Sequence, residues 1–351
     1  MTDLLPPASG PHQTPGPSAE ERADDVAVER AIELLRSVDL GLSDADAGRR
    51  ELAGLLRSVA GAPRRADEDP DRRPRAAPDL ADPAALPGII ENWSRAAGVP
   101  AMAFREDRRA FLRGDHLGFE LSPRLLVRAA VRRLRKVGAL PEEHRISLVW
   151  TGDQPSATLP VRIPDWTAVA LPTRPVALSA QYVHHELGHV MELAWRPPDL
   201  PLAARWQAPD SVVEWVAMVV EWLSRCDDWL TALGLEAERA RQVGEHCRYE
   251  DHYTRAFAAL VLHCAGVRPE RLERELKETV GELIDPGHLR EEVRRADYWR
   301  TVAQGHARAD ATVDVLRAAH GARWWERPES WRRLRADVTA QWAATREAGE
   351  R

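Results

Sequence analysis

Residues 183–190 read Val-His-His-Glu-Leu-Gly-His-Val, and inside this stretch lies a His-Glu-x-x-His sequence. Side chains four positions apart lie on one face of an α-helix, so His185 and His189 can bind one metal ion together. Glu186 then lies next to the metal, where its carboxylate can take a proton from an activated water. The stretch therefore predicts a helix that carries a catalytic zinc site.

The surrounding sequence supports a helix at this position. Its apolar residues recur at helical spacing, and they are Val183, Leu187, Val190, Met191 and Ala194. Pro197 and Pro198 follow and end the helix, because proline cannot donate the next backbone hydrogen bond. His185 and His189 lie off the apolar stripe, so the alternative to a metal site is a pair of surface histidines on an amphipathic helix.

A second segment, 210–225, is apolar on nearly all sides, which predicts a buried helix. Glu214 and Glu221 interrupt it, and their spacing of seven residues places them on one face. A buried carboxylate is unfavourable unless it is paired or binds a metal. Zinc sites of this type need a third protein ligand, and Glu214 is predicted to supply it. Glu221 is predicted to hold a ligating histidine in place by a hydrogen bond.

Both carboxylates have structural alternatives. Ser211 and Glu214 also fit the capping-box pattern, in which the Glu side chain bonds back to the Ser211 amide. Asp210 can cap the helix instead, which leaves Glu214 available to the metal. For Glu221 the alternative is a simple ion pair.

Together, the two segments resemble the thimet oligopeptidase and oligoendopeptidase F family of zinc peptidases. The family's first motif is H-E-x-G-H, and residues 185–189 read His-Glu-Leu-Gly-His. A following helix of the family carries an Asp shortly before a Glu, and then a second Glu followed by Trp. Here these positions are Asp210, Glu214 and Glu221-Trp222. The resemblance covers residues 180–225 and is weak elsewhere.

The resemblance implies a fold, a cofactor and an activity. It implies a mainly α, zincin-like helical metallopeptidase domain with a small β-element before the His-Glu-x-x-His helix. It implies a Zn²⁺ ion held by His185, His189 and Glu214, as in the gluzincin type. The expected reaction is hydrolysis of a peptide bond in small peptides by a metal-activated water, with Glu186 as the general base.

The chain departs from the family in its length and in a late tyrosine-rich motif. Family members are much longer than 351 residues, and their tyrosines stabilise the oxyanion. The nearest counterpart here is 305–313, in which His306 replaces the first Tyr and Val313 a later one. Tyr298 lies one to two turns earlier, and residues 246–253 offer histidines and tyrosines at a different spacing. We expect His306 or Tyr298 to donate a hydrogen bond to the oxyanion.

Three short strands are predicted before the zinc helix, at 146–151, 158–163 and 166–171, because these runs are rich in β-formers and are separated by Pro, Gly and Asp. In related zinc peptidases, an edge strand beside the zinc pairs with the substrate backbone. Residues 167–171 are the candidate here, so we expect Ala168, Val169 and Ala170 to bind the peptide substrate by strand addition.

Composition suggests four regions along the chain. Residues 1–20 are rich in Pro, Gly and Ser and are predicted to be disordered. Helical periodicity over 21–61 predicts a hairpin of two helices, which either docks a partner or packs on the main domain. A Pro/Arg/Asp-rich linker, 62–84, is predicted to be disordered. The catalytic domain is expected at 85–351, with helices at 85–97, 103–113 and 123–137 and a helical end after 226.

The overall charge and the lack of targeting signals narrow the expected partners. The formal net charge is −6, which does not suggest a nucleic-acid partner. No run of about eighteen apolar residues occurs, and the first residues lack a signal-peptide pattern. We therefore expect a soluble, cytoplasmic protein that acts on a peptide and does not bind a membrane. The oligomeric state is not indicated.

Three other functions compete with the peptidase. A catalytically altered relative could act as a binding or regulatory protein, which the missing tyrosines favour and the intact Glu186 opposes. A specialised amide hydrolase in a processing pathway would suit the short chain equally well. A di-iron oxygenase would need a second Glu-x-x-His element, and the sequence has only the one that ends at His189.

Overall fold

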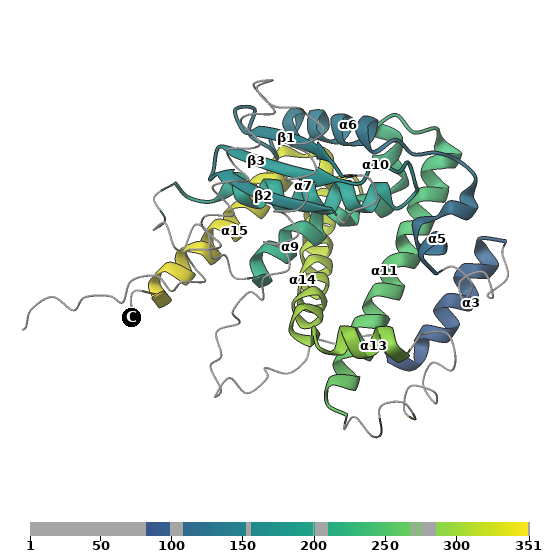
Figure 1. Ribbon diagram of the computed structural model, residues 1–351. Coiled ribbons are helices and arrows are strands. Elements are labelled where there is room, and N and C mark those ends of the chain that lie inside the picture. Colours follow the sequence, from purple (N-terminus) through teal and green to yellow (C-terminus); the bar gives the residue numbers. More distant parts are fainter. Residues whose placement is uncertain are drawn as a thin grey trace, which may run out of the picture. The chain divides into compact units, whose positions relative to one another are not determined.

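A computed structural model describes residues 82–98, 108–151, 156–198, 200, 210–267, 271, 274 and 286–349 (Figure 1). By its contacts the chain divides into two units, 1–68 and 69–351, and the described residues belong to the second. The predicted tail at 1–20, the hairpin at 21–61 and nearly all of the linker at 62–84 lie outside the described residues.

The described part is mainly helical, with a small mixed sheet before the His-Glu-x-x-His helix, as predicted. Helices precede and follow three strands, and the order is as follows. It runs η1 (Pro83–Ala85), α3 (Leu86–Ala96), α5 (Arg108–Arg113), η2 (Asp115–Leu117), α6 (Pro123–Lys136), β1 (Arg145–Trp150), β2 (Ala157–Arg162), β3 (Trp166–Leu171), α7 (Ser179–Trp195), α9 (Asp210–Glu221), η3 (Trp222–Arg225), α10 (Asp227–Ala232), α11 (Ala237–Ala265), α13 (Pro286–Val293), α14 (Ala296–His320), η4 (Trp324–Glu326) and α15 (Pro328–Gly349).

The sheet has the order β1-β3-β2, with β1 parallel and β2 antiparallel to β3. The expectation that 167–171 forms an edge strand is therefore wrong. Ala168, Val169 and Ala170 lie on the central strand, and their backbone is already paired on both sides. The physical reason is burial, because all six residues of β3 are buried, which is typical of a central strand.

Strand β2 is the edge strand that contacts α7, the helix of the His-Glu-x-x-His sequence. Within the described part of the chain it pairs only with β3 and contacts α7. Pro160 lies in the middle of β2, and proline is confined to edge strands because it cannot donate to a ladder on its outer side. Pro160 is thus the sequence signal that distinguishes the edge strand from the centre.

Helix α7 packs against β2 and β3 and also against α9, and α9 in turn packs against α14. In Figure 1, α9 and α14 run side by side away from the strands. A Cβ added at Gly188 would lie only 2.4 Å from the Cα of Ala217. Helices α7 and α9 therefore touch backbone to backbone at Gly188, which brings Glu214, one turn before Ala217, close to the His-Glu-x-x-His sequence.

Two apolar clusters hold these elements. The larger one joins the strands, α6, α7, α9 and the buried tryptophans of the C-terminal region, such as Trp324, Trp325 and Trp331. The smaller one joins α3 to α11 around Trp93 and Phe257. Among the residues that the structure describes, no helix is long and apolar enough to cross a membrane.

Candidate metal centre

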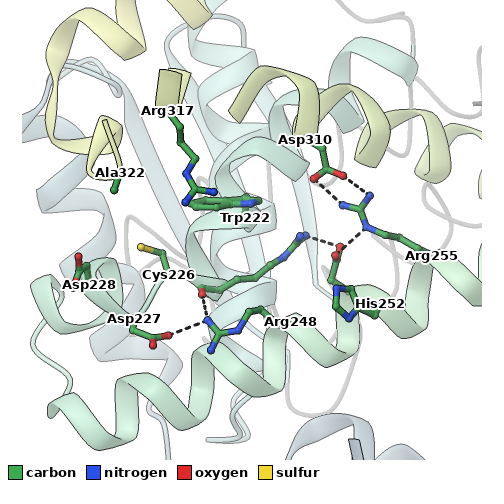
Figure 2. A pocket seen from close by; sticks show the side chains of 12 residues that line it. Trp222, Cys226, Asp227, Asp228, Arg248, His252, Arg255, Asp310, Arg317 and Ala322 are labelled. Carbon is green, nitrogen blue, oxygen red and sulfur yellow. Dashed lines mark hydrogen bonds and ion pairs between the residues drawn. The ribbon is translucent and has the colours of Figure 1, made fainter. Parts of the chain in front are cut away.

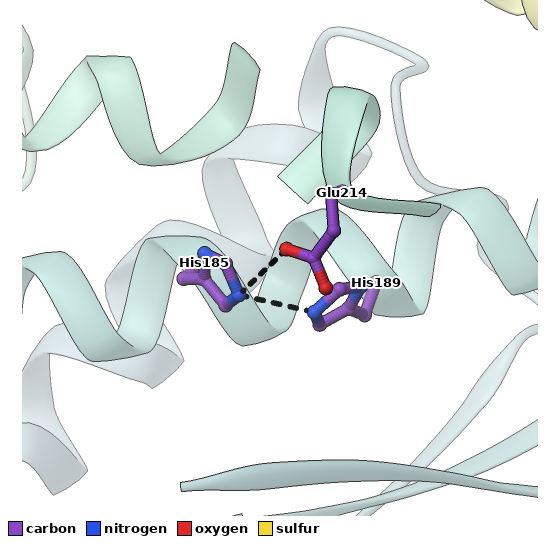
Figure 3. A group of neighbouring side chains, drawn as sticks. All are labelled: His185, His189 and Glu214. Carbon is purple, nitrogen blue, oxygen red and sulfur yellow. Dashed lines mark hydrogen bonds and ion pairs between the residues drawn. The ribbon is translucent and has the colours of Figure 1, made fainter. Parts of the chain in front are cut away.

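His185, His189 and Glu214 meet between α7 and α9 (Figure 3). The Nε2 atoms of the two histidines are 3.1 Å apart, and His185 Nε2 lies 3.7 Å from Oε2 of Glu214. Ligand atoms on a tetrahedral zinc, each about 2.0–2.1 Å from the metal, are about 3.4 Å from one another. The three side chains are half-buried, and their donor atoms and spacing fit zinc.

Two glycines, Gly188 of α7 and Gly305 of α14, let the neighbouring helices approach α9 closely around Glu214. Gly188 permits the close crossing with α7, and Gly305 of α14 faces Glu214 from the other side. A Cβ at position 305 would lie 3.1 Å from the Cβ of Glu214. The two glycines thus fix where Glu214 stands. The capping alternative involves Ser211, whose side chain lies outside the described residues.

Glu221 lies where a residue that orients a metal ligand is expected. Its Oε2 is 2.8 Å from Nδ1 of His185, and Gln181 donates to its Oε1 at 3.0 Å. Burial opposes the charge on Glu221, but the hydrogen bond from His185 prevails and lowers the pKa of this carboxyl to about 2. An ionised Glu221 holds the proton of His185 on Nδ1 and leaves Nε2 to face the other two ligands.

Glu186 is buried, and its carboxylate is held by the sheet. The hydroxyl of Thr158 on β2 donates to Oε2 of Glu186 at 2.6 Å. Burial raises the pKa of Glu186, although the nearby His185 and the Thr158 hydroxyl partly offset the rise. A carboxyl group with a raised pKa is suited to take up and return a proton near neutral pH. Thr158 belongs to no recognisable sequence motif, so the sequence alone does not identify it as a site residue.

His306 does not join the triad. It is buried, and its Nδ1 lies 3.2 Å from Oδ1 of Asp251. Glu221, Asp251 and His306 form a group of their own, which lies on the Nδ1 side of His185. Burial lowers the pKa of His306 to about 4. A buried histidine behind Glu221 cannot reach a substrate, so the predicted oxyanion role does not fit its place.

Tyr298 fits that role better. It lies two turns before Gly305 on the same face of α14, and its side chain is 48% exposed. The protein around its hydroxyl, and then the carboxylate of Glu214, raise the pKa of Tyr298 to about 12. The phenol therefore stays protonated near neutral pH and keeps its O–H as a hydrogen-bond donor.

A chain of ion pairs supports Glu221 from behind, and the sequence did not predict it. Arg225 lies 3.6 Å from Oε1 of Glu221 and 2.7 Å from Oδ1 of Asp251. Asp251 also accepts a hydrogen bond from Arg255 at 2.9 Å. The Glu221–Asp251–His306 group could hold a metal by its atom types, but the guanidinium of Arg225 already neutralises both carboxylates. We therefore regard it as structural.

His184, the remaining histidine of the motif, is buried and accepts a hydrogen bond from Nε1 of Trp229 at 2.6 Å. It belongs to the core and not to the triad.

Comparisons of this chain with protein-family models, with curated proteins and with solved structures find no match. The resemblance to the thimet oligopeptidase and oligoendopeptidase F family thus remains a prediction that rests on the motif residues.

Proposed function

We propose that the protein is a zinc-dependent metallopeptidase that hydrolyses peptide bonds of small peptides. One observation carries the proposal: His185, His189 and Glu214 converge at zinc-ligand spacing while Glu186 lies buried beside them. A binding protein has no need for a carboxyl with a raised pKa at this position, which favours an enzyme over a purely regulatory relative.

Each residue of the site has a distinct task. A zinc ion held by His185, His189 and Glu214 would supply Lewis-acid activation of water and of the scissile carbonyl. Glu186 accepts the proton of the attacking water and later returns it to the leaving nitrogen.

Two further residues assist. Thr158 keeps the Glu186 carboxylate in place through its hydroxyl. Tyr298 donates to the oxygen of the scissile carbonyl as negative charge develops on it.

The outer edge of β2 is the surface on which we expect an extended substrate to lie. Thr158 of this strand contacts Glu186, so a peptide paired with β2 would pass close to the general base. Main-chain hydrogen bonds of this kind accept many side chains, and Pro160 interrupts the donors along the edge. The substrate is therefore expected to be selected more by its extended shape than by sequence.

The first experiment measures metal content and turnover together. Purified protein should contain about one zinc per chain, and a Glu214→Ala variant should lose it. Glu186→Gln should keep the zinc and lose hydrolysis of a quenched-fluorescence peptide library. The matched control is Glu245→Gln, a half-buried carboxylate on α11 paired with Arg241, which should change neither zinc content nor hydrolysis. Protein that binds no zinc even when zinc is added would refute the peptidase. Zinc binding with full activity in Glu186→Gln would refute the general-base assignment.

A further inference from the structure

A cavity of about 710 Å³ opens where η3, α10, α11 and α14 meet (Figure 2). None of the described residues that line it belongs to the triad. Its volume lies within the usual range of small-molecule sites, and charged side chains surround it with one aromatic face, that of Trp222. The charges indicate what it can bind.

Most of the charges around the cavity already have a partner. Three arginines of the wall are held in ion pairs with aspartates. These are Arg225 with Asp251 at 2.7 Å, Arg248 with Asp227 at 3.1 Å, and Arg255 with Asp310 at 2.6 Å. Because each of these arginines already has a carboxylate partner, we treat the three pairs as the wall of the cavity.

Two charges of the lining have no ion pair with any described residue. Arg317 of α14 lies over the ring of Trp222, with its guanidinium carbon 5.5 Å from the ring centroid. Asp228 is exposed in the first turn of α10. In the view of Figure 2, Arg317 lies directly over Trp222, and Cys226 lies between Trp222 and Asp228. The two groups are opposite in sign.

We propose that this cavity binds a short zwitterionic peptide, whose carboxylate pairs with Arg317, whose ammonium pairs with Asp228, and whose middle part lies against Trp222. A short peptide carries one charge of each sign, which complements the two charges of the lining that lack an ion pair with a described residue. A guanidinium binds a carboxylate through two parallel N–H donors, and its stacking on an aromatic ring fixes its orientation.

Calorimetry on chelator-treated, metal-free protein tests the site independently of any peptidase activity. The probes are Gly-Phe-Gly, its N-acetyl form, which lacks the ammonium, and its C-terminal amide, which lacks the carboxylate. Gly-Phe-Gly should bind at least tenfold more tightly than either analogue. Equal binding of all three, or no binding of any, would overturn the proposal.

Variants then locate the peptide. Arg317→Gln and Asp228→Asn should each weaken Gly-Phe-Gly binding about tenfold or more. Arg332→Gln, an exposed arginine of α15 paired with Glu329, should leave it unchanged. Binding that survives both cavity substitutions would place the peptide elsewhere and overturn the proposal.

If a cavity variant fails to fold, the three probes on the unaltered chain still decide.

Discussion

The Nδ1 atom of His185 lies 2.8 Å from Oε2 of Glu221, while Nε2 of the same ring faces His189 and Glu214. One imidazole therefore joins the candidate metal centre to the buried ion pairs behind it. Because Glu221 is ionised and buried, it fixes both the orientation of the ring and the position of its proton. This relationship makes Glu221 the first residue to test.

Substituting Glu221→Gln should weaken zinc binding by about 10- to 100-fold, since the variant keeps the shape of the side chain but loses the charge that holds His185. Competition with a chromophoric chelator measures the dissociation constant for zinc. Glu238→Gln, an exposed carboxylate paired with Arg241, is the matched control. A zinc affinity unaffected by Glu221→Gln would show that the 2.8 Å contact does not support the site.

Substituting Gly188→Ala should disturb both stability and metal binding. The new methyl group would lie 2.4 Å from the Cα of Ala217, so α9 must shift and carry Glu214 with it. Overpacking of this kind costs about 1–3 kcal/mol in the free energy of unfolding, which urea titration measures alongside zinc affinity. Gly88→Ala in α3, where a Cβ meets nothing within 4 Å, should be neutral or slightly stabilising. Equal behaviour of the two variants would contradict the close helix crossing.

Substitutions at Tyr298 and at His306 should have different effects on kcat. Tyr298→Phe should lower kcat by about 10²-fold, the usual effect of removing one oxyanion donor, without changing zinc content. His306→Gln should leave the chemical step close to normal in whatever fraction folds, because that ring lies behind Glu221. Active-site titration with a tight inhibitor corrects kcat for the folded fraction. A large loss of corrected kcat in His306→Gln alone would reverse our assignment.

Stability should fall as the pH is lowered from about 6.5 towards 4. His246 donates from Nε2 to the carbonyl of Leu112 at 2.8 Å, and burial lowers its pKa to about 4, with His116 lowering and Asp115 raising it slightly. A histidine with a depressed folded-state pKa contributes stability above its unfolded pKa, near 6.5, and loses it as the unfolded chain takes up the proton. The loss is at most about 1.4 kcal/mol per pH unit for each such histidine.

Urea unfolding at several pH values measures how the free energy of unfolding depends on pH. His246→Gln should reduce the slope of the unfolding free energy between pH 6.5 and 4. His184 and His306, whose pKa values burial also lowers to about 4, should account for much of the slope that remains. An unchanged slope in His246→Gln would mean that this ring is protonated in the folded protein.

The sequence indicated the zinc helix, the following helix and the β-element, because those features depend on local patterns. Helical spacing alone places His185 and His189 on one face, and the apolar character of 210–225 makes Glu214 and Glu221 conspicuous. The same local patterns could not show which strand lies in the centre of the sheet and which lies at its edge. Only the pairing shows that β3 is central and β2 is the edge, although Pro160 offered a hint.

The residues that only the tertiary structure could reveal come from distant parts of the chain. Thr158 meets Glu186, and Arg225 and Asp251 meet behind Glu221, through packing between elements that share no local pattern. His306 appeared suitable by its order in the chain, yet helix packing buried it. The sequence by itself determined the chemistry of the donors, because spacing on one helix is a local property. The tertiary structure decided which groups support them, because contacts between helices depend on how closely the backbones approach, as at Gly188.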